Sequence, residues 1–77
     1  MDENFCLIRS FYQGQNVEIA VNMRYFKRAF YDSYSSNCLL VLEFADFKIY
    51  HECKKRISLE ILINTLKGNE INLQNLE

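Results

Sequence analysis

Two β-forming segments constrain the fold of this chain more than any other feature: CLLVLEF at 38–44 and FKIYHEC at 47–53. Both are rich in branched and aromatic residues and lie only two residues apart, so they predict an antiparallel hairpin. One register places Glu43 opposite Lys48, which joins opposite charges, and Cys38 opposite Cys53. That register also gathers one apolar set on a single face: Leu40, Leu42, Phe44, Phe47 and Ile49. Because a slip of one residue would turn this set toward solvent, we predict that register and a core on that face.

An earlier pair of segments predicts a second hairpin, NFCLIRSFY at 4–12 and VEIAVN at 17–22, with QGQN between them. Gly14 and Asn16 tolerate the positive φ that a tight turn requires. The first strand is apolar on both sides. One side carries Cys6, Ile8 and Tyr12, and the other carries Phe5, Leu7 and Phe11. Such a strand is expected to be central or covered twice.

The stretch NMRYFKRAFYDSY at 22–34 follows the first hairpin and admits two interpretations. The alternation of 17–21 could continue as a long strand, but it fails at Lys27, which falls on the apolar side. Helical spacing fits the apolar positions better, because they recur at i, i+3, i+7 and i+11: Met23, Phe26, Phe30 and Tyr34. With Asn22 as N-cap, the pattern predicts a helix over 23–34. Phe26 and Phe30 are then core, while Arg24, Arg28 and Tyr31 form an exposed stripe.

A second helix is predicted from SLEILINTLKGN, with Ser58 as N-cap and Gly68 just past its end. Its buried stripe is expected to be Leu59, Leu62, Ile63 and Leu66, which leaves Ile61 without cover. Residues 69–77 are expected to form a weakly ordered tail, in which Ile71 and Leu73 either add a short strand or fold over Ile61. The predicted fold class is α+β: one domain over 1–77, with a small antiparallel sheet of about four strands and two helices, in the order ββαββα.

Composition excludes several classes of function. The longest apolar run, 38–42, is far shorter than the roughly 20 residues of a membrane span. The acidic start Met-Asp-Glu-Asn lacks the basic region of a signal peptide, so we expect a cytoplasmic protein. The odd count of 3 cysteines indicates reduced thiols. A net charge of −1, with 10 scattered acidic residues, is typical neither of a dedicated nucleic-acid binder nor of a nucleic-acid mimic.

The predicted hairpin register brings Cys38, Cys53 and His51 to one sheet face, and these are the residue types that zinc prefers. Cys6 could add a fourth ligand only if the first strand lay alongside. Because no close two-ligand spacing is present, we expect no metal and no other cofactor. A Cys–His nucleophile would further need an orienting group, an oxyanion donor and a pocket. With no catalytic motif in the sequence, we predict no enzyme activity.

Two kinds of binding surface remain. A basic patch could combine Arg24, Lys27 and Arg28 with the run 54–56, and tyrosines beside it could stack on bases. This predicts, as the alternative function, a small nucleic-acid-binding regulator that uses a basic, aromatic helix.

The favoured function is protein binding, because tyrosine and arginine concentrate binding energy and several apolar residues are left over once the helices are docked. The leftover set is Phe5, Leu7, Phe11, Leu39, Val41 and Ile61. The predicted partner-binding residues are Arg24, Arg28, Tyr31, Phe5 and Phe11. The expected partner is a larger protein, and self-association as a homodimer is a further form of the same surface use. A proline-free sequence rich in Asn and Ile fits a phage or mobile-element inhibitor of a host system, or an immunity protein.

Overall fold

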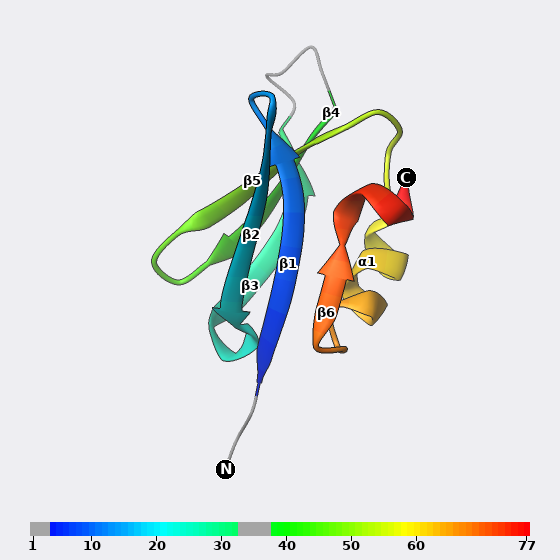
Figure 1. Ribbon diagram of the computed structural model, residues 1–77. Helices are drawn as coiled ribbons and strands as arrows, with labels where there is room; N and C mark the ends of the chain where they lie inside the picture. The colour runs from blue at the N-terminus through cyan, green and yellow to red at the C-terminus, as the bar shows by residue number, and fades with distance from the viewer. Residues whose placement is uncertain (1–3, 33–37) are drawn as a thin grey trace.

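Two three-stranded sheets form the frame of the protein in the computed structural model, which describes residues 4–32 and 38–77. The strand orders are β2-β1-β6 and β3-β4-β5, and a single α-helix, α1, lies beside β6 among the described residues (Figure 1). The strands are β1 Phe5–Tyr12, β2 Gln15–Asn22, β3 Phe26–Tyr31, β4 Cys38–Phe44, β5 Lys48–Cys53 and β6 Glu70–Asn72. The predicted fold, ββαββα with a four-stranded sheet and two helices, is therefore wrong.

The first hairpin is confirmed, and it needs only a two-residue turn. Gln13 has φ 52° and Gly14 has φ 77°, so both turn residues are left-handed, as two-residue hairpin turns require. The ladder between β1 and β2 runs without interruption from Tyr12 opposite Gln15 to Phe5 opposite Asn22. On its other side β1 pairs in parallel with β6, with Ile8 opposite Ile71.

The predicted helix at 23–34 is wrong over the residues that the structure describes. Residues Met23–Tyr25 form a single 3₁₀ turn, η1, and the chain then enters β3. Asn22 does cap that turn, because its Oδ1 accepts a hydrogen bond from Arg24 N at 3.0 Å. The register between β3 and β4 shifts between Phe26 and Arg28, which makes Lys27 the extra residue of a β-bulge. Tyr34, the last position of the predicted stripe, lies outside the described residues.

The bulge explains the error. Phe26 and Ala29 both pack against the core, although an unbroken strand would turn residues three apart to opposite faces. One inserted residue therefore produced a spacing that imitates a helix. Phe30, predicted to be core, is only half-buried and lies outside the core cluster.

The second hairpin has the predicted register. Glu43 lies opposite Lys48, Val41 opposite Tyr50, and Cys38 opposite Cys53. Four members of the predicted apolar set are buried: Leu40, Leu42, Phe44 and Ile49. Phe47 is the exception: it lies in the loop, 44% exposed, and stacks on Phe44.

Helix α1 spans Leu59–Thr65 and begins where predicted, because Ser58 Oγ accepts a hydrogen bond from Ile61 N. It is shorter than expected, with Leu66 as its C-cap, so Gly68 lies further from the helix end than predicted. Leu62 and Leu66 are buried, whereas the other apolar helix residues are exposed: Leu59, Ile61 and Ile63.

Residues 70–76, which we expected within a weakly ordered tail, form β6 and a 3₁₀ turn, η2, over Leu73–Leu76. Ile71 and Leu73 are buried there at 3% and 0% exposure, so this segment completes the core.

One core cluster draws side chains from both sheets and from the helix. It contains Cys6, Ile8, Val21, Leu40, Leu42, Phe44, Ile49, Ile57, Leu62, Leu66, Ile71 and Leu73. Within the described part of the chain, no helix is both long and apolar enough to cross a membrane.

Candidate functional site

The five predicted partner-binding residues do not form one surface. Arg24 is exposed in η1, whereas Arg28 and Tyr31 lie three residues apart in β3 and so point to opposite faces of its sheet. Phe5 begins β1 and is 53% exposed, and Phe11 is half-buried near the other end of that strand. The arginine–tyrosine stripe required a helix, and it is lost with that helix.

Arg28 is engaged within its own sheet. Its Nε lies 2.6 Å from Glu43 Oε1 on the neighbouring strand, and its guanidinium sits 5.6 Å from the centre of the Phe30 ring. The hydrogen bond from Arg28 lowers the pKa of the Glu43 carboxyl. Arg28 therefore belongs to a neutralised cross-strand pair on an exposed face, rather than to a free basic patch.

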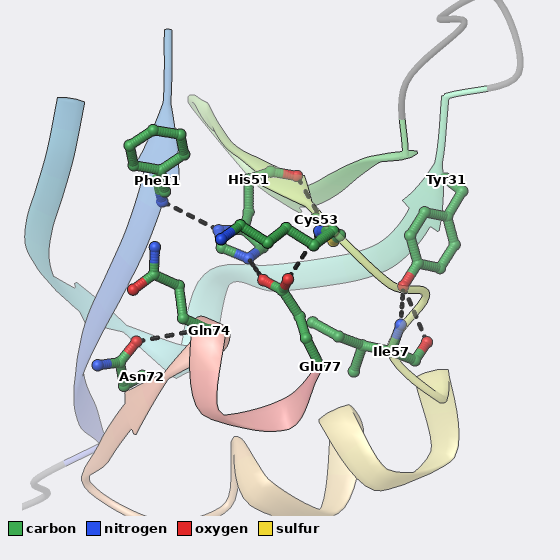
Figure 2. A network of polar contacts seen from close by, with 9 residues as sticks. Phe11, Tyr31, His51, Cys53, Ile57, Asn72, Gln74 and Glu77 are labelled. Carbon is green, nitrogen blue, oxygen red and sulfur yellow. Dashed lines mark hydrogen bonds and ion pairs between the residues drawn. The ribbon is translucent and has the colours of Figure 1, made fainter. Parts of the chain in front are cut away.

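Tyr31 ties two segments of the fold together (Figure 2). Its hydroxyl donates to the Ile57 carbonyl at 2.9 Å and accepts from the Ile57 N–H at 2.6 Å. The Arg56 guanidinium covers the ring, 4.3 Å from its centre. Burial raises the pKa of Tyr31 to about 12. This side chain holds the segment before α1 onto β3, which is a structural role.

A buried histidine, His51, joins β5 to β1 and to the C-terminal segment (Figure 2). His51 has no exposed surface; its Nδ1 lies 2.9 Å from Phe11 N and its Nε2 lies 2.6 Å from Glu77 Oε2. Because the backbone N–H of Phe11 can only donate, Nδ1 must be the unprotonated, accepting nitrogen. The ring proton is then on Nε2 and is donated to Glu77.

Glu77, the C-cap residue of η2, closes this network. Its second oxygen, Oε1, accepts the N–H of Lys54 at 2.7 Å, just beyond the end of β5. Burial acts to raise the pKa of Glu77, but the hydrogen bonds from Lys54 and His51 together outweigh it, so the pKa is lowered. The carboxylate thus joins β5 to the C-terminal segment, and His51 joins both to β1.

The network tests the zinc hypothesis directly. His51, Cys53 and Glu77 place ligand atoms within 4.8 Å of one another, and Cys38 lies opposite Cys53 in the ladder. Zinc would need the lone pair of a His51 nitrogen. Nδ1 already accepts from Phe11, and Nε2 carries the proton, so neither nitrogen is available. The residues as arranged do not fit a metal.

The same geometry disfavours a Cys–His nucleophile. Burial, followed by the neighbouring Cys38 thiol, raises the pKa of Cys53 to about 12, so Cys53 is a thiol at neutral pH. Its Sγ contacts the His51 carbonyl at 3.8 Å. A catalytic histidine must accept the thiol proton, but both ring nitrogens are occupied by other partners. The cluster therefore has a structural role: it joins β1, β5 and the C-terminal segment.

An apolar pocket of about 690 Å³ is a further candidate site. It lies where the start of β1, the η1 turn and the C-terminal end of α1 meet. Its apolar lining is Phe5, Met23, Phe26, Ile63 and Leu66, and its polar rim is Asn4, Lys67, Gly68 and Asn69. Phe5 and Ile63 are 53% and 38% exposed, so the apolar surface is open to a partner.

Of the predicted binding residues, only Phe5 lines this pocket. Met23 and Ile63 were both assigned to buried helical stripes, so their part in a surface site was missed. A signal was present in α1: Leu59, Ile61 and Ile63 follow one another at every second position, and a helix cannot turn all three toward one core.

Comparison of the chain with protein-family models, with curated proteins and with solved structures finds no match.

Proposed function

We propose that this chain is a small, non-enzymatic protein-binding module that acts by occupying a surface of a larger protein. The observation that carries the proposal is the apolar pocket, where Phe5 and Ile63 remain substantially exposed although the other apolar lining residues pack into the fold. Contiguous exposed apolar surface in a small protein marks an interaction site. Concave sites lined by apolar side chains with a few polar groups are the usual form of binding pockets.

The occupant that fits is a large apolar side chain of the partner protein with a carboxylate close beside it. The apolar lining would take up the anchor side chain, as buried anchors do at the centre of protein interfaces. Lys67 stands on the rim and would meet the neighbouring carboxylate. A phage or mobile-element inhibitor, or an immunity protein, is the form of this function that the small size and composition favour.

The structure weakens the support for nucleic-acid binding. Arg28 is paired with Glu43, and Arg9 is paired with both Glu18 and Glu70, so these three carboxylates neutralise cations that phosphates would need. If the alternative were correct, affinity for RNA or DNA would fall by orders of magnitude between about 50 and 200 mM salt.

Two isoleucines of α1 provide a matched test of the protein-binding proposal. Ile63 lines the pocket and Ile61 does not, while both are exposed positions on the same helix. Tagged protein should retain one partner at a stoichiometric ratio, and Ile63→Asp should weaken this binding by about 10-fold or more, as loss of a central anchor does. Ile61→Asp should bind normally.

Both variants should keep the circular dichroism spectrum and melting temperature of the wild type, because both side chains are exposed. A folded Ile63→Asp variant that binds the partner as well as the wild type would show that the pocket is not the binding site. Retention of nucleic acid with steep salt dependence, in place of a protein, would replace the proposal by its alternative.

A further inference from the structure

Strand β2 has a free edge. It lies at the end of the order β2-β1-β6, and among the described residues only β1 pairs with it. It is eight residues long, with an uninterrupted register. A long, regular edge strand presents unpaired backbone groups that can accept another strand.

Lysine, proline and bulges commonly prevent such pairing, and all three are missing from β2, whose one charged residue is Glu18; β3 has both a lysine and a bulge. The β2 sequence QNVEIAVN contains neither lysine nor proline and has no bulge. The other sheet has two edge strands. β3 contains a bulge at Lys27 followed by the exposed Arg28, and β5 begins with the exposed Lys48. The remaining edge strand, β6, is only 3 residues long. The four edges are therefore not equivalent, and β2 is the one most open to a further strand.

The identity of the free backbone groups follows from the hairpin ladder. A two-residue turn makes Tyr12 and Gln15 a hydrogen-bonded pair, and Met23 N donates to Asn4 O at 2.7 Å at the other end. Antiparallel ladders alternate bonded and non-bonded pairs. The odd-numbered β2 residues therefore face β1, and the backbone groups of four even-numbered residues face outward: Asn16, Glu18, Ala20 and Asn22.

We propose that the occupant of this edge is β2 of a second copy of the chain, paired antiparallel about a two-fold axis at Ile19. The register places Glu18 opposite Ala20 of the second copy, and Asn16 opposite Asn22 of the second copy. All four outward residues of each copy then have a backbone partner. The two sheets join into one continuous sheet, and the half-buried Ile19 side chains meet on the axis.

Charge distribution selects this register over its neighbours. A shift by two residues in one direction puts Glu18 opposite Glu18 of the second copy, and like charges directly opposite each other destabilise a sheet. A shift in the other direction leaves Asn16 without a strand residue opposite. In the proposed register Glu18 faces the small, exposed Ala20, which leaves room for its existing ion pair with Arg9 at 2.7 Å.

Self-association of the purified chain tests the proposal, with sedimentation equilibrium over a wide range of protein concentration. The wild type should show a monomer–dimer equilibrium. Ala20→Pro removes only an outward N–H, a position where strand proline is tolerated. It should weaken dimerisation by about 10- to 100-fold in Kd, because each dimer loses two hydrogen bonds. Ala20→Ser keeps the N–H and should dimerise like the wild type.

A cysteine crosslink supplies a second measurement that does not depend on the proline variant folding. Ile19 is the only residue that faces itself, so diamide should convert Ile19→Cys into a covalent dimer. Val17→Cys faces Val21 of the second copy and should remain uncrosslinked, as should the wild type. A wild type that stays monomeric, or a crosslink pattern that does not favour position 19, overturns the proposal. So does an edge that binds a foreign extended peptide while the chain remains monomeric. These variants leave Ile63 intact, so failure here is distinct from failure of the protein-binding proposal.

Discussion

Tyr31 and His51 perform the same structural task in two chemically different ways. Each projects from the sheet β3-β4-β5 and holds a segment of the C-terminal half in place (Figure 2). Tyr31 does so with a neutral hydroxyl that bonds the backbone carbonyl and N–H of Ile57. His51 does so through the Glu77 carboxylate, which is charged at neutral pH. We call the contact of Tyr31 with Ile57 the tyrosine closure, and the contact of His51 with Glu77 the glutamate closure. The two closures respond oppositely to pH.

The sign of each response follows from the pKa shifts. The folded state raises the pKa of Tyr31 from 10.0 to about 12. The stabilisation of the fold by the Tyr31 hydroxyl is therefore complete below pH 10 and is lost as pH rises through 12. The folded state lowers the pKa of Glu77 from 4.5, so its contribution is complete above that value and is lost as pH falls through the folded pKa. Alkali therefore opens the tyrosine closure and acid opens the glutamate closure.

The largest expected effect comes from removing the histidine. His51→Leu keeps most of the buried volume but leaves both the Phe11 N–H and the Oε2 atom of Glu77 without their partner, while Glu77 Oε1 keeps its bond from Lys54. Unsatisfied buried groups of this kind cost about 1–3 kcal/mol each, so the free energy of unfolding should fall by about 3 kcal/mol. Urea unfolding monitored by tyrosine fluorescence measures it. A change below about 0.5 kcal/mol, the size typical of surface substitutions, would show that the network does not hold the fold.

Tyr31→Phe should have the next largest effect. It removes only the hydroxyl, so the N–H and carbonyl of Ile57 lose a shared partner, at a cost of about 2 kcal/mol. Its alkaline unfolding profile should also depend less on pH between 10 and 12 than that of the wild type, with the part due to Cys53 remaining. Tyr25→Phe, at a residue that is 55% exposed, is the control and should leave both quantities unchanged. Equal stability of the two variants would contradict the closure.

Glu77→Gln should have a smaller effect that depends on pH. At neutral pH the loss of charge-assisted hydrogen bonds to His51 and Lys54 should reduce stability by about 1–2 kcal/mol. The difference from the wild type should vanish when the pH falls below the folded pKa, because the wild-type carboxyl is then also neutral. Thermal unfolding at a series of pH values from neutral to strongly acidic tests this. Glu60→Gln, in the exposed first turn of α1, should show no such convergence. A constant difference at every pH would refute the assignment.

The smallest effect is expected for the exposed pair that serves as a reference for the two closures. Arg28→Ala removes the bond to Glu43, but Arg28 is 70% exposed, and surface ion pairs contribute little. Its melting temperature should therefore stay close to that of the wild type. A destabilisation as large as that of Tyr31→Phe would show that burial does not separate the strong contacts from the weak one.

The predictions that succeeded depended on local chemistry. The register that opposes Cys38 and Cys53, the turn containing Gly14, and the cap at Ser58 each follow from residues close together in sequence. The helix at 23–34 failed because a bulge at Lys27 depends on the strand opposite it, which short-range periodicity does not encode.

Contacts between segments that lie far apart in the sequence could not be predicted either. Nothing near His51 in the sequence indicates that Glu77 is its partner, and the parallel pairing of β1 with β6 has no local signal. The pocket was missed for the same reason, since Phe5, Met23 and Ile63 come from three separate elements. The predicted Cys38, Cys53 and His51 group was found because a single hairpin contains it.

The pairing of β1 with β6 also has a consequence for the order of folding events. The two hairpins close short loops, and hairpins form within about 1–10 μs. The contact between Ile8 and Ile71 instead closes a loop that contains most of the chain, and this entropy must be lost before the contact contributes any stabilisation. The C-terminal segment should therefore dock after the hairpins and be the first to detach. During synthesis, one edge of β1 stays unpaired until β6 has been made. An unpaired strand edge is prone to aggregation during this interval.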